Sequence, residues 1–170
     1  MKHMLFVLPL IFMSACTQHQ VIQVHQERPK PIVSTMVKRI PIPLQDRGYR
    51  LLTQQLITKQ SQFEKFLKSI KRQKAWDKKD NFLNILKTSN IDFSKENLLI
   101  YPMEENEGTV IVAVDRPMQL AKHATIHIGK EPSPQIKPNK IYYAVAYLVD
   151  KEIQDITFDL GEDNITISNR

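Results

Sequence analysis

The sequence has little of what many enzymes use to hold a cofactor or a nucleophile. It contains only 4 glycines and a single cysteine, Cys16, in 170 residues. Scarce glycine argues against nucleotide-cradling loops, and no G-x-S-x-G, H-E-x-x-H, S-x-x-K or Walker sequence is present. One cysteine cannot form an internal disulfide, so packing must stabilise the fold. The sequence therefore predicts a non-enzymatic protein with no catalytic residue, no cofactor and no small-molecule substrate.

Apolar runs long enough to cross a bilayer are also lacking. The run Met4–Met13 is entirely apolar but far too short to span a membrane. It follows the basic start Lys2-His3 and precedes the small residues Ser14 and Ala15. This order of basic, apolar and small residues is typical of a secretory signal.

Met13-Ser14-Ala15-Cys16 resembles the lipobox of bacterial lipoproteins. The resemblance implies that residues 1–15 are a signal peptide that is removed, and that Cys16 is the lipidation site at the new N-terminus. Several acyl chains on one residue give stable membrane attachment. Thr17, where retention in the inner membrane would use Asp, favours the outer membrane. The alternative is an ordinary secreted protein in which Cys16 is incidental.

The charge is moderately basic, with 24 Lys and Arg against 18 Asp and Glu. In the cytoplasm such a balance would suggest nucleic acid. The predicted envelope location excludes nucleic acid and leaves lipid head groups, envelope polymers and other proteins as partners. The plainest interpretation is charge that keeps the protein soluble.

The chain divides into a signal peptide (1–15), a spacer (16–44) and one domain (45–170). Four prolines make the spacer extended or irregular, as a semi-stiff tether. Its later part, Ile32–Ile42, is apolar enough to pack on the domain as an edge strand.

Two helices are expected near the start of the domain, after a strand over Tyr49–Ile57, although Leu51–Ile57 is also compatible with a helix. Ser61 and Glu64 have the spacing of a capping box, and the helix should end near Gln73. A second helix should begin near Asp80, whose side chain can cap it. The apolar residues that recur with helical spacing are Phe63, Phe66, Leu67 and Ile70 in the first helix and Phe82, Leu83, Ile85 and Leu86 in the second.

Strands are predicted for the rest of the chain. The pattern indicates an α+β domain, mainly β: an antiparallel sheet or small sandwich with two helices packed on one side. The runs are Leu98–Tyr101, Thr109–Val114, Ala124–Ile128, Ile141–Val149, Ile156–Leu160 and Ile165–Ser168, with a turn at 161–164 before the last.

Three polar clusters were weighed as chemical sites. His123 and His127 share a face of a predicted strand near Glu131, but a zinc site usually needs three or four ligands, so we expect solvent-facing histidines and no metal. The acidic turn at 104–107 is expected to face water. The segment 159–164 lacks the spacing of a calcium loop and is expected to be a hairpin turn.

The densest charge cluster is the stretch 68–79. Its candidate partner-binding residues are Lys68, Lys71, Arg72, Lys74 and Trp76, because basic side chains around a tryptophan can anchor a partner or a membrane surface. The plainer interpretation is a solvated helix face with one aromatic residue that closes the core.

From Tyr49 to Leu160 the chain resembles the PrcB-like domain of bacterial protease complex subunits. The resemblance rests on the helix entry Ser61-Gln-Phe-Glu64, on Ile91-Asp-Phe-Ser-Lys-Glu96 leading into a strand, and on the turn Asn106-Glu-Gly108. It implies a lipid-anchored, non-enzymatic accessory that binds and stabilises a surface or periplasmic protease. It implies no catalytic residues.

Three functional hypotheses follow, of which the third, an envelope hydrolase, rests only on the possibility that catalytic residues are scattered and form no motif. The first is an accessory module of the cell envelope, with the membrane bound through the N-terminal lipid and a protein as partner. The alternative is a structural envelope protein that binds peptidoglycan or acidic lipopolysaccharide through the basic stretch.

Overall fold

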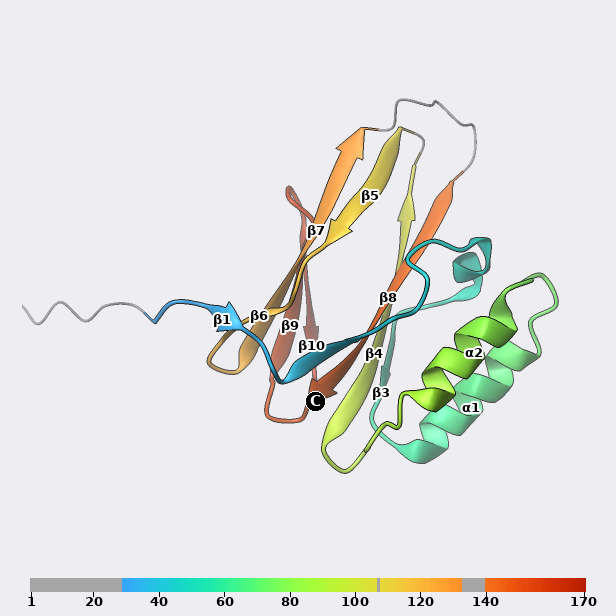
Figure 1. Ribbon diagram of the computed structural model, residues 1–170, viewed down its shortest axis with the longest axis horizontal. Helices are drawn as coiled ribbons and strands as arrows, with labels where there is room; N and C mark the ends of the chain where they lie inside the picture. Colours follow the sequence, from blue (N-terminus) through green and yellow to red (C-terminus); the bar gives the residue numbers. More distant parts are fainter. Residues whose placement is uncertain (1–28, 107, 133–139) are drawn as a thin grey trace, which may run out of the picture.

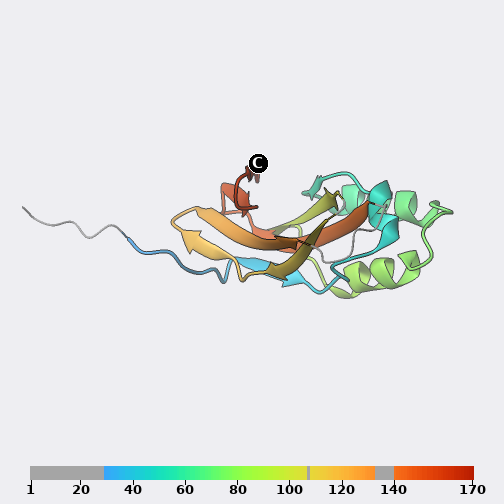
Figure 2. The ribbon, with the colours of Figure 1, turned by 90° about the horizontal axis from the view of Figure 1, so that it is seen from above.

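The computed structural model describes residues 29–106, 108–132 and 140–170. These residues form three layers that follow one another along the long axis of the molecule (Figures 1 and 2). An outer sheet, sheet A, packs on a central sheet, sheet B. Two helices cover the other face of sheet B. The chain enters this body at β1, at the end opposite the helices.

Sheet A has the strand order β1-β6-β7-β9-β10, with β5 paired to the far part of β7. Along β7 the residues from His123 to Ile128 are alternately exposed and buried, so one face packs on the core and the other faces solvent. The strands are β1 Ile32–Val33, β5 Thr109–Val114, β6 Met118–Leu120, β7 His123–Pro132, β9 Asp155–Asp159 and β10 Asn164–Ser168.

Sheet B has the order β2-β8-β4-β3 and is buried on both faces. In β4, Leu99 and Tyr101 face sheet A, whereas Leu98 and Ile100 face the helices. In β8 the fully buried residues on the helix side are small, Ala144 and Ala146. The strands are β2 Val37–Ile40, β3 Gln55–Ile57, β4 Glu96–Glu105 and β8 Ile141–Asp150.

The helix layer contains α1 Gln60–Lys71 and α2 Lys79–Thr88, preceded by a short 3-10 helix, η1 Arg47–Leu51. The buried residues of α1 and α2 come from the predicted apolar faces, and Leu67 and Ile85 are partly buried beside them. Asn90 follows α2 with φ 48°, a backbone conformation that ends helices. Among the described residues, no helix has the length and apolar character needed to cross a membrane.

The fold class is confirmed: the domain is α+β and mainly β, with both helices on one side of a sheet. All six predicted strand runs are strands. The predicted edge strand within Ile32–Ile42 is also present, since β2 forms an edge of sheet B. The sheets therefore include residues that precede residue 45, which the sequence had assigned to the spacer.

Four local predictions are wrong. Only Gln55–Ile57 of the first predicted strand is a strand, because the residues before it form η1, in which the side chain of Asp46 accepts a hydrogen bond from Gly48 N at 2.8 Å. Ser61 lies inside α1, and Thr58 donates its backbone N–H to Gln62 Oε1 at 2.9 Å in place of the expected capping box. Asp80 lies in the first turn of α2 and does not cap it. The sheets are not wholly antiparallel, because β7 and β9 pair in parallel.

Tyr147 gives a first testable prediction. Its side chain is fully buried between the sheets, and its hydroxyl has no hydrogen-bond partner among the described residues. Burial raises the pKa of Tyr147 to about 12. Because the unfolded chain ionises near pH 10 and the folded chain resists ionisation, the native state loses stability as pH rises from about 10 to 12. Tyr147→Phe should match or exceed the wild-type stability at pH 7, by up to about 1 kcal/mol, and should lose less stability at alkaline pH.

Urea unfolding of both proteins at neutral and alkaline pH would measure this difference. A Tyr147→Phe protein that is clearly less stable than wild type at pH 7 would show that the hydroxyl has a stabilising partner.

Candidate functional site

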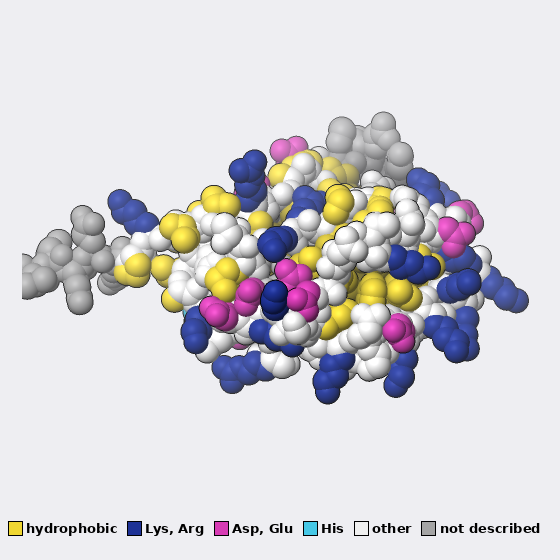
Figure 3. Space-filling view, turned by 60° about the horizontal axis from the view of Figure 1, so that its bottom comes forward, with side chains coloured by type: hydrophobic (Ala, Val, Ile, Leu, Met, Phe, Trp, Pro, Cys, Tyr) yellow, Lys and Arg dark blue, Asp and Glu magenta, His cyan; other side chains and the backbone are white. Residues whose placement is uncertain are grey.

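The basic residues of the candidate site lie at the helix end of the molecule. Lys68 and Lys71 are in the last turn of α1, and Arg72 and Lys74 follow it. All four side chains are exposed, because the opposite face of α1 carries the buried Phe63, Phe66 and Ile70. Figure 3 shows dark blue side chains gathered at this end, on the right of the view. We call these four residues the basic face.

No carboxylate neutralises the basic face within the described part of the chain. The described residues form six ion pairs, and none of these includes a residue of the basic face. Lys68 and Lys71 also lie where the partial negative charge of the α1 C-terminus favours cations, which contributes a few tenths of a kcal/mol in water. The positive potential of this face is therefore directed to solvent.

Trp76 does not belong to this surface, and its place among the candidate partner-binding residues is wrong. It is 1% exposed and fills the core between η1 and α2. Its ring lies 5.6 Å from that of Tyr49, edge to face, and 4.9 Å from that of Phe82. The plainer interpretation, an aromatic residue that closes the core, describes it.

Beside the basic face lies a hollow that the sequence did not predict. It has a volume of about 630 Å³ and opens between η1 and the segment that joins α1 to α2. Its charged lining residues are Asp46, Arg47, Arg50, Asp77 and Lys78. The two arginines come from η1, a 3-10 helix that the sequence pattern did not predict, since it assigned Tyr49 onward to a strand and Arg47 to no element. The mixture of cations and carboxylates suits a polar or ionic group of a partner.

The two histidines lie on the solvent face of sheet A, as expected. His123 Nδ1 is 3.2 Å from Asp155 Oδ2, and His127 Nδ1 is 3.4 Å from Asp159 Oδ2, in register across the parallel β7–β9 pair. The pKa of Asp159 is lowered, mainly by the backbone N–H of Gly161 and further by His127. Within the described residues, no three His, Cys, Asp or Glu side chains lie together as metal ligands would.

Glu104 and Glu105, which the sequence placed in a turn that faces water, lie at the end of β4 and form ion pairs with lysines. Glu105 pairs with Lys130 at 2.6 Å, and Glu104 pairs with Lys140. Hydrogen bonding to Glu104 raises the pKa of Lys140. Glu107 lies outside the described residues. Segment 159–164 joins β9 to β10, with Gly161 at φ 90°.

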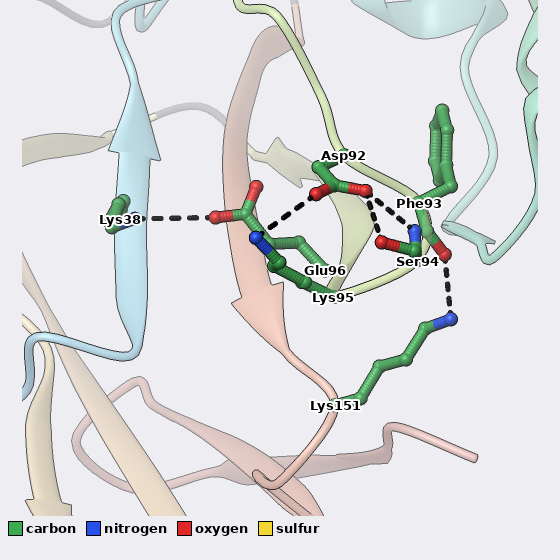
Figure 4. A network of polar contacts seen from close by, with 7 residues as sticks. All are labelled: Lys38, Asp92, Phe93, Ser94, Lys95, Glu96 and Lys151. Atoms are coloured by element: carbon green, nitrogen blue, oxygen red, sulfur yellow. Dashed lines mark hydrogen bonds and ion pairs between the residues drawn. The ribbon is translucent and has the colours of Figure 1, made fainter.

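The segment that carries the family resemblance forms a polar network between α2 and β4 (Figure 4). Asp92 accepts hydrogen bonds from Ser94 N at 3.0 Å and from the Ser94 hydroxyl at 2.5 Å. These bonds, the hydroxyl first, lower the pKa of Asp92. Lys151 donates to the carbonyl of Phe93 at 2.7 Å, and Lys38 pairs with Glu96 at 3.3 Å.

Phe93 stabilises the same segment from the apolar side. Its ring lies 5.6 Å from that of Phe63 of α1. Asp92 therefore fixes the turn that leads into β4, and Phe93 packs that turn against the helix layer, so their role in the fold explains both residues without a partner.

Comparison with known proteins adds no relative. No protein-family model matches the chain, and neither the curated proteins nor the solved structures include a match. The resemblance to the PrcB-like domain stays a prediction, and so does lipidation at Cys16, which lies outside the described residues.

Proposed function

We propose that the protein is a lipid-anchored lipoprotein of the bacterial cell envelope that binds a partner protein without catalysing a reaction. The lipid on Cys16 holds the protein to a membrane. Thr17, the residue after the cysteine, favours the outer membrane. The domain then lies in the periplasm or at the cell surface. The resemblance to the PrcB-like domain suggests a protease as the partner, which the bound accessory would stabilise.

One observation carries this proposal: the basic face and the point where the chain enters the domain lie at opposite ends of the molecule (Figure 1). A chain held by its N-terminus presents its far end to the surroundings. That end has four exposed cations without a carboxylate partner among the described residues, next to a polar hollow of about 630 Å³. Such a surface favours an acidic partner and steers its approach.

Crosslinking on detergent-solubilised membranes tests the proposal. The wild-type chain should capture one stoichiometric protein, and a triple variant, Lys71→Glu, Arg72→Glu and Lys74→Glu, should lose most of that capture. The matched control reverses two exposed lysines and one exposed arginine outside the basic face: Lys59→Glu, Lys87→Glu and Arg170→Glu. Both triple variants change exposed residues and should fold as the wild type does.

Two outcomes would contradict the proposal. Capture of no stoichiometric partner would oppose the accessory role, and equal capture by the two triple variants would oppose the basic face as its site. Cys16→Ser tests the anchor separately, since it should move the chain from the membrane fraction to the soluble fraction.

A second candidate function uses the same face. Unpaired cations also suit peptidoglycan or acidic lipopolysaccharide, which would make the protein a structural component of the envelope. Purified cell wall should then pellet the chain in a salt-sensitive way, since salt screens exposed charges. Unchanged pelleting after reversal of Lys71, Arg72 and Lys74 would exclude this function.

A further inference from the structure

A compact apolar surface lies at the end of the molecule where the chain enters the domain. Strands β1 and β6 form a two-stranded ribbon at the edge of sheet A, with Val33 opposite Met118. Leu120, two residues beyond Met118, shares their face because side chains alternate along a strand. The exposed fractions are 52% for Val33, 37% for Met118 and 42% for Leu120.

The apolar character of the ribbon does not continue onto the neighbouring strand, β7. On the same face, β7 places Thr125 opposite Met118 and His123 opposite Leu120. Farther across the sheet lies Asp155, which is paired with His123. Ile32, on the other side of the ribbon, is 66% exposed and widens the apolar edge. Figure 3 shows yellow side chains at this end of the molecule, on the left of the view.

In the sequence, basic residues lie close to the ends of both strands of the ribbon. Lys30 lies two residues before β1, Arg116 two residues before β6 and Lys122 two residues after it. All three are exposed, and none forms an ion pair within the described part of the chain. Exposed apolar side chains bordered by Lys and Arg suit the interface of an anionic bilayer.

The ribbon is also the structured part nearest to the proposed anchor along the chain. Fifteen residues lie between Cys16 and Ile32, and this stretch can span at most about 55 Å. A lipid on Cys16 would hold β1 within that distance of the membrane. Tethering makes a second contact effectively intramolecular, at a local concentration on the order of millimolar, so a few side chains suffice.

We propose that the face of the β1–β6 ribbon formed by Val33, Met118 and Leu120 binds the surface of the anionic phospholipid bilayer that carries the anchor. The inference rests on the proposed anchoring at Cys16. It orients the domain, because binding at this end directs the basic face away from the membrane. The partner-binding surface then projects toward the wall or toward a soluble domain of a partner.

An environment-sensitive fluorophore tests the contact in the full lipidated chain. Leu120→Cys is labelled with NBD, and Cys16 does not react because its sulfur is acylated. On vesicles of equal parts phosphatidylcholine and phosphatidylglycerol, emission should shift to the blue and about double, as the probe enters the interface. Pure phosphatidylcholine vesicles should give a smaller change. Adding Val33→Asp should remove most of it.

The matched control is Val112→Cys with the same label. Val112 is 49% exposed on β5, which pairs with the opposite end of β7 from the ribbon. Its emission should not change on either kind of vesicle. A probe at this position therefore reports any effect of anchoring that does not depend on the ribbon.

Three outcomes would overturn the inference. Unchanged emission at position 120 in a chain that sediments with the vesicles would exclude the contact and leave the anchor intact. Labelling of Cys16 itself would show a free thiol and contradict the anchor together with the inference. A rise at position 120 without vesicles that grows with protein concentration would identify a second copy of the chain as the occupant.

Discussion

Trp76→Ala is expected to lower the free energy of unfolding by about 3–5 kcal/mol, the range for removing a large buried aromatic side chain. The side chain is 1% exposed, and its ring packs against Tyr49 and Phe82. The space it leaves is bounded by η1 and α2, two separate elements that would have to move together to close it. Urea unfolding at neutral pH measures the loss.

Gly48 makes the prediction sharper, because its lack of a side chain creates the space that Trp76 occupies. A Cβ at position 48 would lie 2.0 Å from Cδ1 of Trp76 and 2.1 Å from its Cγ, far inside van der Waals contact. Gly48→Ala should therefore cost about 1–3 kcal/mol or more through overpacking. In a Trp76→Ala background the same change should cost much less, since the clash is gone.

The double-mutant cycle distinguishes this packing from a general intolerance of change at either site. Additive losses for Gly48→Ala and Trp76→Ala would contradict the packing described here. Trp76→Phe is the conservative control: it keeps an aromatic ring and removes an indole N–H that has no hydrogen-bond partner among the described residues. It should cost much less than Trp76→Ala.

Asn169→Leu is expected to lower the free energy of unfolding by about 3 kcal/mol, because it leaves several buried polar groups without partners. Asn169 is 5% exposed. Its Nδ2 donates to the carbonyls of Asp150 at 3.0 Å and Ile153 at 2.8 Å, and its Oδ1 accepts from Asn97 Nδ2 at 2.9 Å. One side chain thus joins the end of the chain to β4 and to the turn after β8.

Asn169→Asp separates shape from hydrogen bonding, since it keeps the size and the acceptor but loses both donors. It should also be strongly destabilised. The exposed neighbour Ser168 provides the matched control, and Ser168→Ala should change stability by less than about 0.5 kcal/mol. A loss for Asn169→Leu no larger than that of Ser168→Ala would show that the network contributes little.

The sequence predicted well those elements whose hydrophobic pattern has one explanation. The alternation of apolar and polar residues in Ala124–Ile128 indicated a sheet with one solvent-exposed face, and this sheet is sheet A. The uninterrupted apolar runs at Leu98–Tyr101 and Ile141–Val149 became the central strands β4 and β8, which are buried on both faces. Helical spacing identified the buried faces of α1 and α2 because one side of each helix faces the same hydrophobic core on sheet B.

The candidate site was predicted in part. The local charge density at 68–74 placed the basic face, since Lys68 and Lys71 lie one turn apart in α1 and Arg72 and Lys74 follow directly. Trp76 was misplaced because its surroundings in the sequence are basic, whereas its surroundings in space are Gly48, Tyr49 and Phe82. No local pattern at Gly48 indicates that a tryptophan 28 residues later will pack on it.

The sequence by itself determined the fold class, most of the strands and helices, the apolar faces and the basic face, because each depends on the spacing of residues along one element. Tertiary structure alone decided the parallel pairing of β7 with β9, the packing of Trp76 on Gly48, the network at Asn169 and the hollow beside η1. These features depend on contacts between residues far apart in the chain. Many such contacts are possible, and the packing of whole layers decides which of them form. Contacts of this kind produce no periodic pattern of residues in the sequence.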